Sequence, residues 1–213
     1  MSLTIILPTY NEAENINPLI RAIRKYVPQA DILVVDDNSP DGTAQRVKTG
    51  PRVNLLVRTT SRGLTNSLRE AIAASNTDLV AWMDCDFSHP PEVIPKLTKQ
   101  IASADIVIAG RKIYPFLSVI INSVCQLFFG RDMHDYTTGF LVARRSILKT
   151  IPLRGNYGEY CIDLLVRAKR KGFRIVEVPY DSPPRAHGMS KTSLRFGFGY
   201  LTTVWNLLWT SDR

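Results

Sequence analysis

Short, almost uninterrupted apolar runs alternate with amphipathic segments through the first half of the chain. The runs predict strands at residues 4–7, 32–35, 53–57, 79–83 and 106–109, and the segments between them predict helices at 12–26, 41–48, 64–75 and 91–102. Strands that are apolar on both faces are typical of parallel sheets covered by helices on both sides. The alternating order therefore predicts an α/β fold whose ligand site lies at the carboxyl ends of the strands.

The pattern changes after residue 110. Longer apolar segments predict helices at 116–129, 158–171 and 193–209, and two further strands are expected at 138–142 and 175–179. No linker rich in glycine or serine, no internal repeat and no low-complexity tract separates the two halves. We therefore expect a single domain over residues 1–213.

Charge divides the chain more sharply than hydropathy does. The net charge is +8 over 213 residues, with 11 Lys+Arg against 12 Asp+Glu in residues 1–110 and 16 against 7 in residues 111–213. All of the positive excess thus lies in the second half. Such asymmetry indicates a partner rich in phosphate, which is a nucleic acid, an anionic membrane or a phosphorylated small molecule, or else a solvated basic face.

The cysteines and the apolar runs bear on the cellular setting. Three cysteines at wide spacing, Cys85, Cys125 and Cys161, favour neither a disulfide framework nor a zinc site, and a reducing, cytoplasmic location fits them. The N-terminus lacks the basic segment of a signal peptide. The longest apolar run, 116–129, is interrupted by polar residues and is too short to span a bilayer.

Three acidic clusters follow directly after predicted strands, at residues 8–12, 36–43 and 84–86. Each one taken alone also fits a helix start, a turn or a pair of loop acids. Together they fall where an open α/β sheet places its site. Asp84 and Asp86, two residues apart at a strand end, are suited to hold Mg²⁺ or Mn²⁺ with positions left for phosphate oxygens.

Six motifs, in this order, carry a resemblance to a known family. They are Pro8-x-Tyr10-Asn11-Glu12, the run from Asp36 to Thr43, Asp84-x-Asp86 with the following Phe-Ser-His-Pro-Pro-Glu92, Gly110-Arg111, Thr137-Thr138-Gly139-Phe140, and Arg185-x-x-Gly188-x-Ser190-Lys191. The ordered set resembles the family 2 glycosyltransferases, and most closely the polyprenyl-phosphate (dolichol-phosphate) mannosyltransferases. The resemblance runs from residue 4 to about residue 195.

The resemblance implies a GT-A fold, which is Rossmann-like with a mostly parallel central sheet, followed here by an amphipathic C-terminal helix. It implies an inverting transfer of a hexose, mannose from GDP-mannose, onto the phosphate of a polyprenyl or dolichyl carrier, with Mg²⁺ or Mn²⁺ as cofactor. Residues 1–110 then form the half that binds the nucleotide-sugar, and residues 111–213 form the half that faces the acceptor and the membrane.

The resemblance also assigns residues to roles. It places Pro8, Tyr10, Glu12, Val35, Asp37, Asp84 and Cys85 against the nucleotide-sugar, and Asp84, Asp86 and Ser88 at the metal. It places Asp86, Arg111, Arg185 and Lys191 in catalysis, and Arg111, Thr138, Asp163, Arg185 and Lys191 at the acceptor phosphate. A phosphate acceptor is already ionised near pH 7, so it needs cations to screen it rather than a general base. Three alternatives stay open: Arg111 as a surface cation, Lys191 as a solvated residue, and Asp163 as an exposed partner of Arg167 at i,i+4.

Departures from the family pattern affect the acceptor side most. Ser88 stands where many relatives have glutamine, the loop after Arg111 is short, and Leu141 stands where arginine is common. The apolar residues of 116–129 and 193–209 form either a core or a surface for a membrane. A polyprenyl substrate lies in the bilayer, so the enzyme must at least visit the membrane. We expect it to be peripheral on the cytoplasmic face, with a membrane-anchoring partner subunit as a further option.

Two rival functions remain at the level of sequence. One is a family 2 enzyme that uses a UDP-sugar, such as a polyprenyl-phosphate glucosyltransferase. The other is a non-catalytic scaffold of glycosyltransferase shape. A nucleic-acid partner is disfavoured, because the first half is slightly acidic and no helix-turn-helix, RRM or KH pattern occurs.

Overall fold

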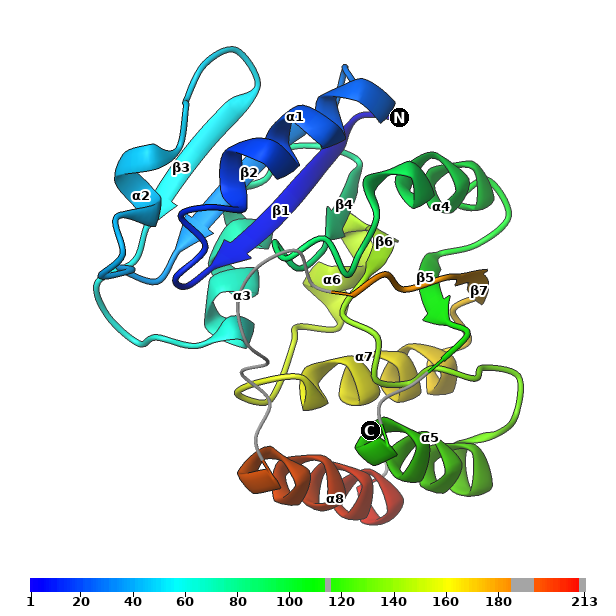
Figure 1. The fold of residues 1–213 in the computed structure, drawn as a ribbon. Helices are drawn as coiled ribbons and strands as arrows, with labels where there is room; N and C mark the ends of the chain where they lie inside the picture. The colour runs from blue at the N-terminus through cyan, green and yellow to red at the C-terminus, as the bar shows by residue number, and fades with distance from the viewer. Residues whose placement is uncertain (114–115, 185–193, 211–213) are drawn as a thin grey trace.

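A computed structural model describes residues 1–113, 116–184 and 194–210, with the backbone alone for 194–198. Its centre is a seven-stranded sheet in the order β3-β2-β1-β4-β6-β5-β7 (Figure 1). The strands are β1 (Leu3–Thr9), β2 (Asp31–Asp36), β3 (Val53–Val57), β4 (Leu79–Trp82), β5 (Ile106–Arg111), β6 (Leu141–Arg144) and β7 (Ile175–Tyr180). Six of the seven lie where the apolar runs predict them, within one or two residues at each end.

The sheet is mostly parallel, with one exception. β6 runs antiparallel to both of its neighbours, β4 and β5. It also begins at Leu141, so the expected strand at 138–142 is shifted toward the C-terminus. The reason is that the Thr138 hydroxyl donates to the Ala109 carbonyl at 2.7 Å and accepts from the Phe140 amide. These bonds hold residues 138–140 in an irregular loop that leads into β6.

Helices cover both faces of the sheet, and each face has its own core. Ile5 and Leu7 face a core shared with α1 and α4, while Ile6 and Trp82 face a core shared with α3 and α7. The helices are α1 (Ile16–Tyr26), α2 (Thr43–Arg46), α3 (Leu64–Ala74), α4 (Ile94–Gln100), α5 (Phe116–Phe129), α6 (Arg145–Thr150), α7 (Glu159–Arg170) and α8 (Leu194–Trp209), with a 3-10 turn, η1, at Pro91–Val93. Near-continuous apolar strands follow from this burial on two sides.

Three predicted helices have wrong bounds, and one helix was missed. The helix expected at 91–102 is the 3-10 turn η1 followed by α4, which ends at Gln100. α1 begins at Ile16 rather than at residue 12, because the Glu12 carbonyl accepts from the Asn15 and Ile16 amides and closes a turn first. α2 is only one turn long, and residues 41–42 belong to the loop before it. α6 follows β6 without a loop. Its six residues are too few for a helical period to appear in the sequence.

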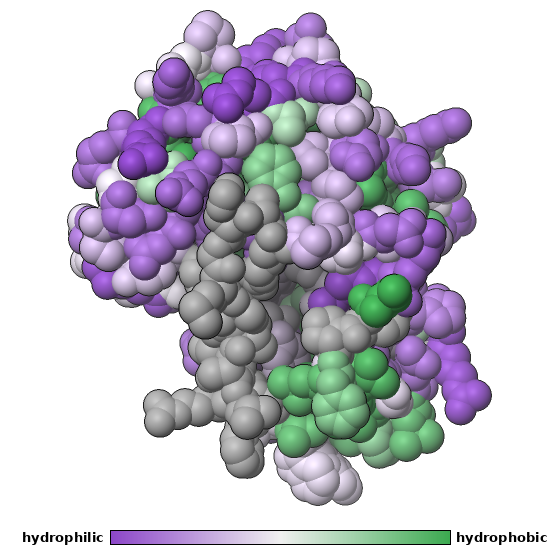
Figure 2. Space-filling model, viewed as in Figure 1, coloured by the Kyte–Doolittle hydropathy of each residue, from purple (hydrophilic) through white to green (hydrophobic). Residues whose placement is uncertain are grey.

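α5, α7 and α8 form a layer at the end of the molecule away from β3 (Figure 1). α8 packs against α7 and α5. Apolar side chains gather on the outer surface of α5 and α8 (Figure 2). The most exposed are Phe116, Leu127 and Phe128 on α5 and Trp205 and Trp209 on α8. Within the described residues, no helix has both the length and the apolar character that crossing a bilayer requires.

Candidate active site

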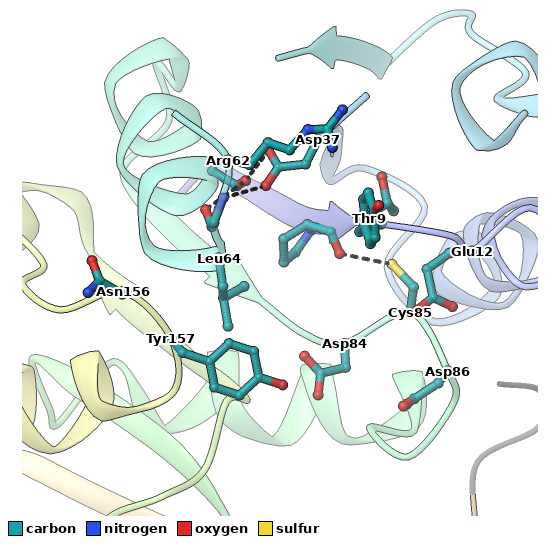
Figure 3. Close-up of a pocket in the computed structure, with 14 residues that line it drawn as sticks. Thr9, Glu12, Asp37, Arg62, Leu64, Asp84, Cys85, Asp86, Asn156 and Tyr157 are labelled. Carbon is teal, nitrogen blue, oxygen red and sulfur yellow. Dashed lines mark hydrogen bonds between the residues drawn. The ribbon is translucent and has the colours of Figure 1, made fainter. Parts of the chain in front are cut away.

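A cavity of about 370 Å³ opens at the carboxyl ends of β1, β2 and β4 (Figure 3). This is where the chain, after adding β2 and β3 on one side of β1, crosses over to add β4 on the other side. Open α/β sheets bind ligands at such a switch point. The cavity is lined by seven of the residues expected at the donor or metal, namely Pro8, Tyr10, Glu12, Asp37, Asp84, Cys85 and Asp86.

Val35 is the expected donor residue that does not line the cavity. It lies inside β2, pairs with Pro8 in the register of the sheet, and is buried in the core. Its carbonyl accepts from the Thr9 hydroxyl at 3.3 Å. The position of Val35 thus supports the end of β1, while the next residues of the chain turn toward the cavity.

Asp36 and Asp37 have different tasks although they are adjacent. Asp36 is fully buried and accepts from the Ser39 amide at 2.8 Å and from the Thr9 hydroxyl at 2.9 Å. It fixes the loop that follows β2, in which Asn38 takes a left-handed backbone with φ of 55°. Asp37 lines the cavity instead, across from Asp84 (Figure 3).

A buried arginine, Arg58, holds Asp37 in place. Arg58 pairs with Asp37 and donates to Glu70 at 2.9 Å, with its own side chain 1% exposed. Asp37 also accepts from the Gly63 amide and the Ser67 hydroxyl, each at 2.8 Å. Burial by itself lowers the pKa of Arg58, but hydrogen bonds to Glu70 and Asp37 outweigh it and leave the pKa raised. Sequence reasoning missed Arg58, whose only signal is its position directly after β3.

Asp84 and Asp86 present their carboxylates on one side of the cavity (Figure 3). Ser88 orients Asp86, because its amide and hydroxyl donate to the same Asp86 oxygen at 3.0 and 2.6 Å. Phe87, between them, has a φ of 66°, and this left-handed residue turns the chain back sharply enough for that contact. Cys85 lies between the two acids, with its thiol 3.7 Å from the Pro8 carbonyl. The hydroxyl of Ser88 thus positions a carboxylate.

His89 supports the loop that carries Asp84 and Asp86. It is buried and stacks on Phe140 with ring centroids 5.1 Å apart. The Asp84 amide donates to His89 Nδ1 at 2.9 Å, so this nitrogen is unprotonated. Burial lowers the pKa of His89, in spite of the nearby carboxylates. The histidine is therefore a neutral support for the backbone of Asp84, and this accounts for its place after the acidic pair.

The acidic pair fits a hard divalent cation on the chemistry of its donors. No hydrogen bond from another described side chain or amide reaches the Asp84 carboxylate, and one oxygen of Asp86 is held by Ser88. Across the described residues, no group of three His, Cys, Asp or Glu side chains comes together to enclose a metal alone. Two carboxylates with substrate phosphate oxygens completing the shell are the usual arrangement for Mg²⁺.

Arg111 is paired with a buried acid that sequence reasoning missed. At the end of β5, Arg111 Nε and Nη2 donate to the two oxygens of Asp135 at 2.7 and 2.9 Å. Nη2 also donates to the Thr137 hydroxyl at 2.7 Å. Asp135 is 0% exposed. Arg111 is thus a rigidly held cation rather than a mobile surface residue. The motif Gly110-Arg111 gave no sign of a partner 24 positions away.

The other expected acceptor residues separate into three cases. Thr138 is 1% exposed, and its hydroxyl donates to the Ala109 carbonyl. Asp163 pairs with Arg167 at 3.0 Å, which confirms the predicted i,i+4 contact, although both side chains are buried and not exposed. Arg185 and Lys191 lie outside the described residues. The described chain leads up to them from Ser182, whose hydroxyl donates to the Ser88 carbonyl at 3.0 Å.

Two further parts of the chain line the cavity without having been predicted. Asn156 and Tyr157 come from the loop before α7, and Figure 3 shows the Tyr157 hydroxyl pointing into the space beside Asp84. Arg62 lies on the opposite wall, with its guanidinium carbon 5.8 Å from the centre of the Tyr10 ring. Both come from loops of ordinary composition, so their approach to the cavity depends on the tertiary fold alone.

Comparison with known proteins places this geometry in a family. A model of glycosyl transferase family 2 matches residues 4–151. The chain belongs to glycosyl transferase family 2. It is therefore a glycosyltransferase, and the resemblance drawn from the ordered motifs is confirmed.

Named relatives cover most of the chain. An undecaprenyl-phosphate mannosyltransferase of Micrococcus luteus is 34% identical over 91% of this chain and 88% of that protein. A polyprenol monophosphomannose synthase of Mycolicibacterium smegmatis is 34% identical over 89% and 80%. A dolichol-phosphate mannosyltransferase of Pyrococcus furiosus is 31% identical over 98% of this chain, which spans 64% of that longer protein.

Solved structures agree on the fold. Glucosyl-3-phosphoglycerate synthase from Mycobacterium tuberculosis, crystallised with Mn²⁺, UDP-glucose and phosphoglyceric acid, superposes with a TM-score of 0.82 over 99% of this chain and 81% of its own. The two sequences are 19% identical, so the likeness speaks for the fold alone. It confirms the predicted GT-A architecture with its mostly parallel sheet.

Proposed function

We propose that this glycosyltransferase moves mannose from GDP-mannose to the phosphate of a polyprenyl carrier, with inversion at the sugar carbon. The observation that carries the proposal is the acidic cavity at the switch point of the sheet, in a chain whose relatives at 31–34% identity are named for mannose transfer to polyprenyl phosphates. The cavity supplies the donor site, and the names of the relatives supply the sugar and the acceptor.

The donor nucleoside is expected between Tyr10 and Asp37. Tyr10 is 38% exposed at the cavity wall and offers a ring face to a base. Asp37 is held in place by Arg58, and its carboxylate is suited to accept from base N–H groups. Glu12 faces the same space, and its amide is tied to the Thr43 hydroxyl at 2.9 Å. These side chains bind and orient the nucleotide before any chemistry occurs.

Asp84 and Asp86 would hold Mg²⁺ or Mn²⁺ against the donor diphosphate. When bound, the cation neutralises the diphosphate and makes it a better leaving group. Ser88 and His89 keep the two carboxylates in position through the bonds described above. Cys85 lies between the two acids and is expected to contact the nucleotide through its backbone.

The acceptor phosphate attacks with an oxygen that is already ionised near neutral pH, so no general base is needed. What it needs is positive charge together with directed hydrogen-bond donors, because an anion must approach a second anion. We assign this task to Arg111, Arg185 and Lys191, and we place Asp163 beside them on the acceptor side. Thr138 contributes indirectly, since its hydroxyl fixes the end of β5 from which Arg111 extends. Positioning and electrostatic stabilisation then supply most of the rate.

The acceptor is a membrane lipid, and we propose that α5 and α8 rest on the cytoplasmic face of its membrane. Five apolar side chains of α5 and four of α8 are more than a third exposed, and they gather on one outer surface (Figure 2). An amphipathic helix that buries such a surface in the headgroup region binds without spanning the bilayer. The basic charge of residues 111–213 favours an anionic leaflet. A membrane-anchoring subunit is the alternative occupant.

The decisive experiment follows labelled mannose from GDP-mannose into an organic-extractable lipid phosphate, with Mg²⁺ or Mn²⁺ and polyprenyl phosphate in vesicles. We expect transfer that stops on addition of a chelator and in the Asp86→Ala variant. Transfer from UDP-glucose and not from GDP-mannose would favour the rival enzyme. If no donor supports transfer while GDP still binds, the protein is a scaffold and the proposal is wrong.

A further inference from the structure

The carboxylate of Asp135 lies behind Arg111 and organises it from inside the protein. One oxygen accepts from Arg111 Nε at 2.7 Å and from the Arg111 amide at 3.2 Å. The other oxygen accepts from Arg111 Nη2 at 2.9 Å, and also from the amide and hydroxyl of Thr137 at 3.1 and 2.9 Å. Asp135 is 0% exposed, so its carboxylate does not contact solvent or substrate directly. It can therefore act only through Arg111 and Thr137.

We propose that Asp135 is a positioning residue for the transfer: it fixes the Arg111 guanidinium in the orientation that receives the acceptor phosphate, and Asn122 ties this pair to α5. The inference rests on the function proposed above, in which Arg111 faces that phosphate.

The geometry explains why such a residue is useful. An arginine side chain has several rotatable bonds and loses freedom when it binds a phosphate. Asp135 engages Nε and Nη2 together, and Thr137 engages Nη2 as well, so the plane of the guanidinium is set before the acceptor arrives. Preorganised donors cost no reorganisation when charge develops in the transition state.

The charge of the pair leads to the same conclusion. Burial raises the pKa of Asp135, but the hydrogen bonds and the charge of Arg111 outweigh it, so the pKa is lowered and the acid is ionised at neutral pH. The pair is then formally neutral, which means that Arg111 offers the phosphate directed hydrogen-bond donors more than net charge. The Arg111→Lys variant keeps the positive charge but cannot make the bidentate contact with both oxygens of Asp135.

Asn122 joins this pair to the helix that we place at the membrane. α5 buries only three residues, Ile121, Asn122 and Cys125, and Asn122 is the polar one among them. Its amide nitrogen donates to Asp135 at 3.3 Å, and its oxygen accepts from the Tyr136 amide at 2.9 Å. The opposite side of the same helix exposes Phe128 and Leu127. One hydrogen bond, from Asn122 to Asp135, therefore links α5 directly to the acid that orients Arg111.

A double-mutant cycle between Asp135→Asn and Arg111→Lys tests the proposal. With polyprenyl phosphate in vesicles, we expect Asp135→Asn to lower kcat/KM for the acceptor on the order of 10- to 100-fold and to leave the KM for GDP-mannose unchanged, since misplacing a catalytic contact acts on the rate. In the Arg111→Lys background, we expect Asp135→Asn to add less than about twofold, because its partner is already lost. Asp132→Asn, in the same loop as Asp135, is the matched control: it breaks an exposed ion pair with Lys169 of α7 and should change neither constant.

A second pair of variants covers the case in which Asp135→Asn fails to fold. Thr137→Val removes the hydroxyl that bridges Arg111 and Asp135 at little change in volume, and Asn122→Ala removes the link to α5. Each is expected to lower acceptor kcat/KM several-fold and to be non-additive with Arg111→Lys. If the fold-losses in kcat/KM of the single variants multiply in the double variant, the two residues act independently and the inference is wrong. The same holds if only the KM for GDP-mannose rises. In either case the proposed function still stands. If wild-type protein binds GDP but transfers nothing to polyprenyl phosphate, the function fails and the inference fails with it.

Discussion

Tyr200 of α8 lies directly over Gly158, the residue before α7. A Cβ at Gly158 would stand 1.9 Å from the Tyr200 hydroxyl oxygen. Gly158 has a φ of −72°, so its backbone accepts any residue and the glycine is required by this contact alone. The contact places α8 against the residue that follows Asn156 and Tyr157, two residues that line the cavity beside Asp84.

We expect Gly158→Ala to move α8 away from α7 and to lower the free energy of unfolding by about 1–3 kcal/mol, the usual cost of overpacking. Urea denaturation measures it. Gly50→Ala is the matched control, because a Cβ there meets nothing within 4 Å. Tyr200→Phe removes the nearest atom and should restore part of the loss. If the losses of Gly158→Ala and Tyr200→Phe simply add, the contact does not fix α8.

Arg58 offers a test of the donor side. Arg58→Lys keeps the charge but cannot bond Asp37, Glu70 and the Ser61 carbonyl together as the guanidinium does. Asp37 should lose its fixed orientation, and we expect the Kd for GDP in isothermal titration to rise about tenfold, the scale of one good hydrogen bond to a charged group. The acceptor KM should stay unchanged.

Arg52→Lys is the control for that substitution. Arg52 pairs with Asp31 at 3.2 Å with half of its side chain exposed, far along the sheet from the cavity. Exposed pairs of this kind contribute at most about 1 kcal/mol, and no effect on GDP is expected. Equal losses of GDP affinity in both variants would mean that charge in general, and not the Arg58 contacts, supports Asp37.

The Arg58–Asp37 and Arg111–Asp135 pairs mark the limit of what the sequence predicted. Apolar runs located the strands because their period is local, and the acids after β1, β2 and β4 were placed correctly because parallel strands bring their carboxyl ends to one edge. Arg58 and Asp135 were missed because each acts through a partner 21 or 24 positions away, and no local pattern encodes such a pair. The loop at residues 138–140 before β6 was missed for the same reason: the Thr138 bond that shapes it reaches back to β5.

Acid should weaken the Asp135 pair in a defined range of pH. The folded pKa of Asp135 lies below the unfolded value of about 3.9. The stability that its charge contributes is therefore present above that unfolded value and is lost as the pH falls through the folded pKa. We expect the difference in unfolding free energy between wild type and Asp135→Asn, about 3–5 kcal/mol near neutral pH for a broken buried pair, to shrink below about pH 4.

Urea unfolding at pH 6, 4 and 3 measures this difference. Asp132→Asn, whose acid is 58% exposed at its side chain, should differ from wild type by less than about 1 kcal/mol at each pH. A wild-type advantage over Asp135→Asn that stays constant down to pH 3 would show that Asp135 contributes by packing and hydrogen bonding without its charge.

The exposed apolar surface of α5 and α8 can be separated from catalysis by the choice of acceptor. Phe128 and Trp205 are 53% and 62% exposed, so serine at both positions removes apolar area without opening the core. Each loses at least about 1 kcal/mol of interfacial burial, and the double variant should bind anionic vesicles at least tenfold more weakly in flotation assays. Transfer to polyprenyl phosphate in those vesicles should fall with it, whereas transfer to a short-chain, water-soluble prenyl phosphate should not.

Tyr26→Ser, which removes an exposed aromatic residue of α1, is the control. Equal losses on both acceptors would assign these side chains to the stability of the fold, because only membrane binding distinguishes the two substrates.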